Sequence, residues 1–151
     1  MKLLGVIGLL LTGTALGSYF SNRIKRKIAI CDDLIKLCDR LAVDMRYKQS
    51  PIIPLVLEYT DDTNISFISK ENFYSNTTTD SILSDKENEQ IGDFIFSLGK
   101  TDSKSQINII DAFRQYMDSI KKEYSEAYKR KSKVYITFGM CGGLMLSLLL
   151  I

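Results

Sequence analysis

Two uncharged apolar segments, one at each end of the chain, constrain its fold more than any other feature. Residues 3–20 and 134–151 contain no charged side chain. Each provides about 18 residues, or roughly 27 Å of helix at ~1.5 Å per residue, enough to cross the hydrocarbon core of a bilayer. A charge at mid-membrane costs roughly 2.5 to 3.5 kcal/mol on insertion scales, so two such stretches favour transmembrane helices over buried core helices.

Basic residues on the inner side of each segment indicate the topology. They are Arg23, Lys25, Arg26 and Lys27 after the first segment and Lys129, Arg130, Lys131 and Lys133 before the second. Lys and Arg mark cytoplasmic flanks, and at a membrane surface they suit anionic headgroups. We therefore expect a protein of the cell membrane, with a transmembrane helix at 1–20, a cytoplasmic domain at 21–133 and a second transmembrane helix at 134–151.

The first segment has an alternative interpretation as a signal peptide. Lys2 precedes the apolar run, and Ala15-Leu16-Gly17 has the small-x-small pattern of a cleavage site. Cleavage would leave an exported protein that begins at Ser18 and is anchored only by its C-terminal segment. The basic cluster that directly follows the segment argues against this, because it resists translocation.

Each terminal segment also carries two glycines spaced four residues apart. They are Gly13 with Gly17 and Gly139 with Gly143. This spacing allows two helix backbones to approach closely in lipid. The two segments could therefore pack on each other or on partners, although small residues are common in membrane helices.

Composition argues against catalysis, a cofactor or a metal site. The chain has no histidine, the commonest general acid or base near neutral pH. Its three cysteines, Cys31, Cys38 and Cys141, form no C-x-x-C pair. Gly99-Lys100-Thr101 resembles the end of a phosphate-binding loop, but Phe94 stands where that loop requires glycine. Since the net charge is only +2, no nucleic-acid partner is expected either.

The middle of the chain reads as a series of helices. Apolar positions from Ile24 to Met45 recur every three or four residues and predict one long helix ending near Lys48, with Cys31 and Cys38 in its core stripe. Ser50 as N-cap before a proline predicts a short helix over 51–59. The polar stretch that follows gives only a weak indication of a helix around 64–75.

Two further helices are clearly marked. Ser84 and Glu87 form a capping box, and Gly99 lies at the expected C′ position. Asp102 or Ser103 begins the last helix, with Ser103 and Gln106 in capping-box spacing. The sequence thus predicts an all-α antiparallel bundle of about five to six helices, the first and last continuous with the transmembrane helices. Four acidic residues of the 84–98 helix form a candidate partner surface or a solvated face: Asp85, Glu87, Glu89 and Asp93.

The order of these parts resembles a known family. The chain opens with Met1-Lys2-Leu3-Leu4-Gly5, continues through a long amphipathic helix and a proline-started helix, and contains Phe96-Ser97-Leu98-Gly99 leading through Asp102 to Gln106. This arrangement, over nearly the whole chain, is similar to the stage III sporulation protein AB family of spore-forming bacteria. The region 60–80 departs from the family pattern, since it is short and polar.

The resemblance implies a function in sporulation. Proteins of that family belong to the assembly linking mother cell and forespore, are encoded with an ATPase, and have a soluble domain similar to the cytoplasmic domains of the type II secretion inner-membrane platform protein. It implies a platform or scaffold in the mother-cell membrane facing the forespore, with sporulation-complex membrane proteins and a cytoplasmic ATPase as partners. By the same resemblance, Leu98, Gly99, Asp102 and Gln106 form a structural helix-turn-helix corner.

A second function stays open at this point. The chain could be a generic membrane-anchored helical protein that forms homo-oligomers through its transmembrane glycines and binds no ATPase. A lipid or small-molecule carrier is a weaker alternative, because the apolar stripe is wide enough to be filled by the protein itself.

Overall fold

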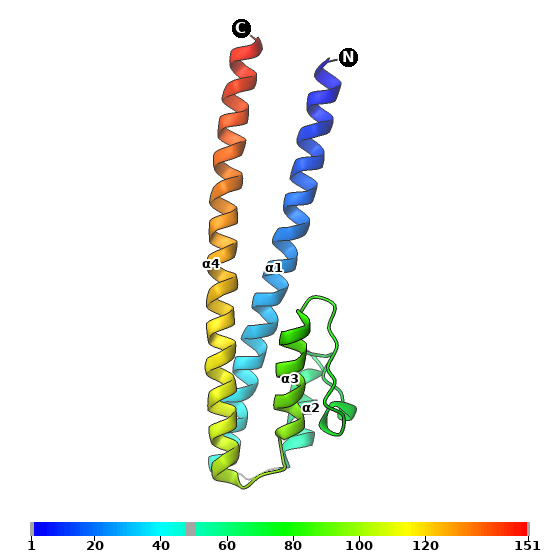
Figure 1. Ribbon diagram of the computed structural model, residues 1–151, viewed down its shortest axis with the longest axis vertical. Coiled ribbons are helices and arrows are strands. Elements are labelled where there is room, and N and C mark those ends of the chain that lie inside the picture. The colour runs from blue at the N-terminus through cyan, green and yellow to red at the C-terminus, as the bar shows by residue number, and fades with distance from the viewer. Residues whose placement is uncertain (1, 48–50, 151) are drawn as a thin grey trace. The chain divides into compact units, whose positions relative to one another are not determined.

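The computed structural model describes residues 2–47 and 51–150, and the side chains of residues 22–47 and 51–131. The described residues form helices and no strand (Figure 1). The elements are α1 (Lys2–Tyr47), α2 (Ile52–Thr60), the short 3-10 helix η1 (Lys70–Phe73), α3 (Asp85–Ser97) and α4 (Ser103–Leu150). The predicted all-α class is confirmed, and the described residues contain four α-helices and one 3-10 helix where five to six helices were expected.

The chain divides into two compact units. The terminal unit comprises residues 1–25 and 123–151, and the central unit comprises residues 26–122. The long helices α1 and α4 contribute residues to both units, whereas α2, η1 and α3 belong to the central unit alone. The two units are treated separately below.

Within the central unit, α1 and α4 pack side by side in antiparallel directions. Lys121 Nζ lies 2.5 Å from Asp32 Oδ1, and Arg114 Nε lies 2.5 Å from Asp39 Oδ1. The two partners are seven residues apart on each helix and run in opposite order, which fixes an antiparallel register. Because these side chains are partly exposed, each pair contributes only about 0.2–1 kcal/mol. Their main effect is on register.

The core of the central unit is built around one row of α1. Ile30, Leu34, Leu37 and Leu41 have no exposed surface. Ile30 and Leu34 share their neighbourhood with Ile91 of α3 and with Met117 of α4. This row therefore lies between two helices. Ile28 and Ile35, on the neighbouring side of α1, are only partly buried.

Helices α3 and α4 are joined by an aromatic stack. The rings of Phe94 and Phe113 lie face to face, with centroids 3.8 Å apart and planes inclined by 4°. Both side chains are buried. Such a pair contributes about 0.5–1.5 kcal/mol beyond the burial of its apolar surface.

Both cysteines of α1 are core residues, as predicted. Cys31 is 2 % exposed and Cys38 has no exposed surface. The pKa of Cys31 is raised from 9.0 to about 11 and that of Cys38 to about 12, mainly because burial desolvates both thiols. Both thiols are therefore protonated and unreactive in the folded protein at neutral pH.

The start of α2 differs from the prediction. Helix α2 begins at Ile52, and Pro51 is its N-cap residue with extended backbone angles (φ −60°, ψ 126°). The sequence predicted Pro51 inside the first turn and Ser50 as the cap, but Ser50 lies outside the described residues. The fixed φ of proline suits this extended position before the first turn as well.

The polar segment between α2 and α3 is held by asparagine side chains and not by a helix. Only η1 is helical, so the helix predicted around 64–75 was too long. The backbone N–H and Nδ2 of Asn64 donate to Asp33 Oδ2 of α1 at 3.0 and 2.8 Å. Asn72 Nδ2 donates to the carbonyl of Thr77. The buried side chains of Ile65, Ile68 and Phe73 anchor the segment to the core.

Asn88 of α3 holds the last part of this segment. Its Nδ2 donates to the Asp80 carbonyl at 3.0 Å, and its Oδ1 accepts from the Asp80 backbone N–H at 3.0 Å. The Thr78 hydroxyl donates to the Asn88 carbonyl at 2.5 Å. This segment approaches α3 closely at Gly92, where a Cβ would lie 3.3 Å from the carbonyl oxygen of Asn76 and would force that segment to shift slightly.

Replacing Gly99 tests the turn that joins α3 to α4. Gly99 has φ +80°, and a Cβ built there would meet no atom within 4 Å. Gly99→Ala should therefore lower the free energy of unfolding by about 1–2 kcal/mol through backbone strain alone. Gly99→Asn should lower it by less, because Asn tolerates this conformation better. Urea unfolding of the full chain in detergent measures both, and equal losses would contradict the explanation.

The raised thiol pKa values predict a stability that falls at alkaline pH. In the unfolded chain both thiols ionise near pH 9.0. In the folded protein Cys31 ionises only near pH 11 and Cys38 only near pH 12. Their contribution is therefore fully present below pH 9 and is lost as the pH rises toward 11–12. The urea midpoint of a Cys141→Ala chain should fall between pH 8 and pH 10.5.

The matched control is the chain that also carries Cys31→Ala and Cys38→Ala. It should show a smaller fall in midpoint over the same pH range, although it starts from a lower stability. A fall of the same size in both chains would mean that other groups cause the alkaline loss.

Candidate functional site

The described side chains contain little that could form a catalytic or metal-binding centre. Among the described side chains, no group of three His, Cys, Asp or Glu residues is placed to hold a metal ion. The two described cysteines are buried and protonated, so neither is a ready nucleophile. The surfaces of the helices are therefore the better place to look for a functional site.

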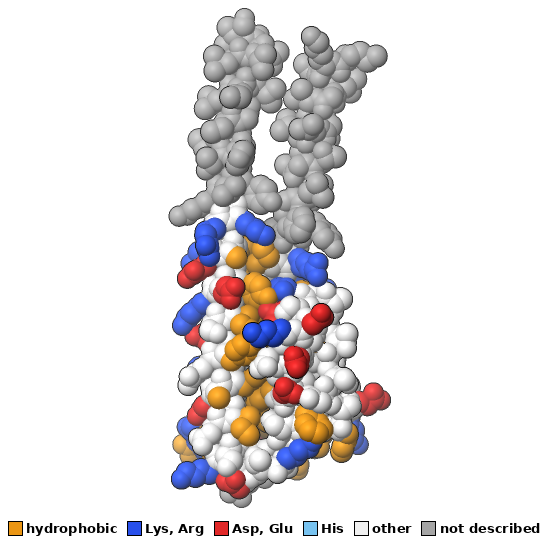
Figure 2. Space-filling view, viewed as in Figure 1, with side chains coloured by type: hydrophobic (Ala, Val, Ile, Leu, Met, Phe, Trp, Pro, Cys, Tyr) orange, Lys and Arg blue, Asp and Glu red, His pale blue; other side chains and the backbone are white. Residues whose placement is uncertain are grey.

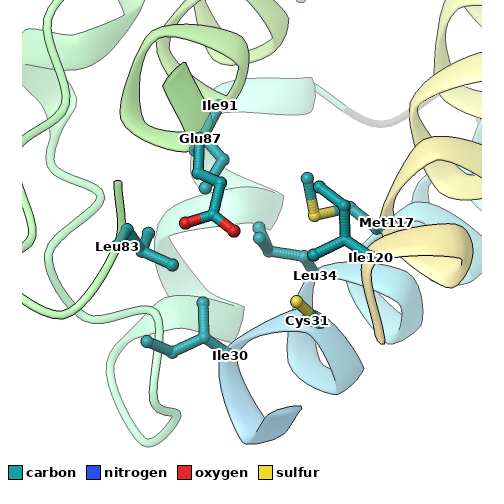
Figure 3. Close-up of a pocket in the computed structure, with 8 residues that line it drawn as sticks. All are labelled: Ile30, Cys31, Leu34, Leu83, Glu87, Ile91, Met117 and Ile120. Atoms are coloured by element: carbon teal, nitrogen blue, oxygen red, sulfur yellow. The ribbon is translucent and has the colours of Figure 1, made fainter. Parts of the chain in front are cut away.

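A small hollow lies where α1, α3 and α4 meet (Figure 3). It has an empty volume of about 190 Å³, which includes open space between atoms, and no room for a water molecule. Its lining is apolar except for Glu87, whose carboxylate points in among the apolar side chains. The lining residues are Ile30, Cys31, Leu34, Leu83, Glu87, Ile91, Met117 and Ile120. We interpret the hollow as a packing gap of the core.

Glu87 has a structural role in the fold. Its Oε2 accepts from the Ser84 backbone N–H at 2.7 Å and from the Ser84 hydroxyl at 2.9 Å, the predicted capping box. The same atom forms an ion pair with Lys27 Nζ at 3.4 Å. Glu87 is 6 % exposed, and the Lys27 side chain is 16 % exposed. Glu87 is therefore buried and does not contribute to an exposed acidic surface, whereas Lys27 is partly exposed.

The paired carboxylates of α1 are also structural. Asp32 contacts Lys121 at 2.5 Å and Lys36 at 2.6 Å, and these two hydrogen bonds, Lys121 first, lower the pKa of Asp32. Its neighbour Asp33 is 9 % exposed and accepts two hydrogen bonds from Asn64. Each carboxylate has its own partners because adjacent helix residues point in different directions.

The four residues of the expected helix-turn-helix corner lie together between α3 and α4. Leu98 is the C-cap of α3 and is 3 % exposed, and Gly99 follows with its positive φ. Lys100 Nζ lies over the ring of Phe96, so it is turned back onto α3. The corner therefore ends α3 and sets the direction in which α4 begins.

Asp102 lies at the start of the last helix, as one of the two predicted starts, whereas Gln106 has a role that the spacing did not predict. Asp102 precedes the first residue of α4, and its Oδ2 accepts from the Ser105 backbone N–H at 3.2 Å. Hydrogen bonds from Ser105 lower the pKa of Asp102. Gln106 is 1 % exposed, and its Nε2 donates to the Ser97 carbonyl at 3.2 Å. Gln106 thus ties α4 to the end of α3 instead of forming a capping box with Ser103.

Three of the four predicted acidic residues of α3 form an exposed stripe. Asp85, Glu89 and Asp93 are spaced by four residues, and all three are exposed. Asp93 Oδ1 accepts from Asn76 Nδ2 at 2.5 Å, which leaves Asp85 and Glu89 as the outward charges of the stripe. We call Asp85, Glu89 and Asp93 the α3 stripe.

The predicted basic residues divide in the same manner. Arg23, Lys25 and Arg26 are exposed, as are Lys129, Arg130 and Lys131, whereas Lys27 is paired in the core. In the terminal unit, Lys25 Nζ lies 5.6 Å from the centre of the Tyr128 ring. The side chain of Lys133 lies outside the described residues.

The predicted membrane segments are not tested by the described side chains. Among the residues that the structure describes, no helix is long and apolar enough to cross a membrane. The side chains of 1–20 and 134–151 lie outside that description, and with them the four glycines at 13, 17, 139 and 143. The two transmembrane helices and their glycine contacts therefore stay predictions.

Sequence reasoning missed the residues that fix the polar segment and the α1–α4 register. Asn64, Asn72 and Asn88 make long-range or loop contacts that no local pattern announces. The ion pairs could have been predicted from the sequence. Two acidic residues lie seven apart on the first long helix and two basic residues lie seven apart on the last, which matches an antiparallel order.

One comparison with known proteins identifies the chain. No curated protein and no solved structure matches it. A family model, described as stage III sporulation protein AB, matches residues 57–151. The match covers the end of α2 from residue 57, then η1, α3 and α4 with the corner between them. The chain therefore belongs to the stage III sporulation protein AB family, which gives it a role in sporulation.

Proposed function

We propose that this chain is a non-enzymatic platform, or scaffold, of a membrane complex between mother cell and forespore. In this proposal the helices of residues 1–20 and 134–151 anchor it in the mother-cell membrane, and the central unit faces the cytoplasm. The family membership supports a sporulation role. The complex, the membrane and the partner are parts of the proposal itself.

The antiparallel pairing of α1 with α4 is the observation that carries the proposal. Because the two helices run in opposite directions in the central unit, the chain leaves this unit at the same end through both. Each helix then leads toward one of the two uncharged segments of the sequence. This geometry suits a protein that enters one bilayer twice from the same side.

The central unit suits a scaffold because three of its carboxylates are paired with other residues of the same unit. Glu87, Asp32 and Asp33 are paired inside the unit. The α3 stripe, in contrast, leaves Asp85 and Glu89 exposed. We propose that this stripe contacts the cytoplasmic ATPase that the family resemblance implies.

A single reporter cysteine tests the topology. Ser66 is exposed, so Ser66→Cys should react in a chain that also carries Cys141→Ala. Cys31 and Cys38 can stay in place because they are buried. We expect an impermeant maleimide to label this chain only after the cells are permeabilised.

Two controls frame the topology experiment. The chain with Cys141→Ala alone should stay unlabelled under both conditions, and a cysteine appended after Ile151 should react from outside. Labelling of Ser66→Cys in intact cells would overturn the proposed orientation.

Charge reversal on α3 tests the proposed ATPase contact. Asp85→Lys with Glu89→Lys should lower recovery of the sporulation ATPase with the full chain from detergent-solubilised membranes by several-fold, because like charges would replace complementary ones. Asp61→Lys with Asp62→Lys is the matched control, since both residues are exposed and lie off the stripe.

The outcomes separate the two functions that the sequence left open. Loss of the ATPase with the α3 variant and not with the control supports the scaffold. Recovery of a second copy of this chain without any ATPase from wild-type membranes would support self-association instead.

A further inference from the structure

The charges of the chain are segregated between its two units. The net charge of the whole chain is only +2. The terminal unit has seven basic and two acidic residues, which are Lys2, Arg23, Lys25, Lys129, Arg130, Lys131 and Lys133 with Glu123 and Glu126. The remaining 13 basic and 16 acidic residues belong to the central unit. The terminal unit is thus positive and the central unit negative.

The described positive charges of the terminal unit face solvent. We call Arg23, Lys25, Lys129, Arg130 and Lys131 the basic collar, and all five are exposed. Figure 2 shows blue side chains gathered over the described parts of α1 and α4 in this unit. Arg130 is 3.9 Å from Glu126, but both side chains are more than 70 % exposed, so this ion pair is weak.

Tyrosines accompany the collar. Tyr124 and Tyr128 are half-buried on α4, and Lys25 Nζ lies over the Tyr128 ring at 5.6 Å. A tyrosine with a partly buried ring and a polar tip is typical of the boundary between headgroups and water. Single-stranded nucleic acid is instead bound by aromatic rings that are open for base stacking. The combination therefore favours a lipid surface.

We propose that the basic collar binds anionic phospholipid headgroups in preference to zwitterionic ones. The inference rests on the proposed membrane anchoring and adds the lipid class to it. The Arg and Lys side chains supply charge-assisted hydrogen bonds to phosphate oxygens. The negative central unit gains nothing from an anionic surface, so the preference is confined to the collar.

The absence of tryptophan from the sequence allows a sharp test. Tyr128→Trp places a single fluorescent reporter in the collar, and its ring can keep the contact with Lys25. The full chain is reconstituted in phosphatidylcholine vesicles that contain a fixed fraction of phosphatidylglycerol. Bromine atoms quench tryptophan fluorescence. One sample contains brominated phosphatidylglycerol, and the other contains the same mole fraction of brominated phosphatidylcholine.

We expect brominated phosphatidylglycerol to quench at least about twofold more than brominated phosphatidylcholine, and the excess to shrink in high salt. Adding Lys129→Gln, Arg130→Gln and Lys131→Gln should remove most of the excess. The matched control adds Lys70→Gln, Lys86→Gln and Lys104→Gln, three exposed residues of the central unit, and should keep it.

The possible results distinguish this inference from the proposed function. Equal quenching by both lipids, or the same loss in the collar and control variants, would overturn the lipid preference and leave the membrane anchoring intact. No quenching by either lipid would place Tyr128 away from the bilayer and would overturn the anchoring as well.

Discussion

The antiparallel pairing of α1 with α4 is the constraint on which the rest of the central unit depends. Asp32 with Lys121 and Asp39 with Arg114 set its register. In that register, the buried row of α1 meets α3 on one side and α4 on the other, and Phe113 reaches Phe94. The ion pairs are individually weak, so the free energy comes mainly from the apolar row and the charges select one register.

The parts that could be predicted from sequence are those specified by local signals. The 3.6-residue period marked α1 and α4, and the Ser84–Glu87 box and Gly99 marked both ends of α3. These signals act within one or two turns of backbone. The burial of Cys31 and Cys38 followed from the same period. The family resemblance was confirmed by the match over 57–151.

The parts that could not be predicted depend on contacts between distant residues. Asn64 and Asn88 determine the path of the polar segment, but their partners lie on other elements or in loops. The sequence placed Glu87 both in a capping box and among four candidate surface acids, and the structure shows it 6 % exposed and paired with Lys27. Gln106 has the spacing of a cap but bonds to the end of α3. Local spacing cannot separate these alternatives.

Short-range cross-linking tests the α1–α4 register most directly. Asp39→Cys with Arg114→Cys, and Asp32→Cys with Lys121→Cys, should both be joined by a short bifunctional maleimide, since each pair is in contact. Asp39→Cys with Lys121→Cys, and Asp32→Cys with Arg114→Cys, are offset by seven residues, about 10 Å along the helix, and should not be joined. Equally efficient cross-linking of the offset pairs would contradict the antiparallel register and the fold built on it.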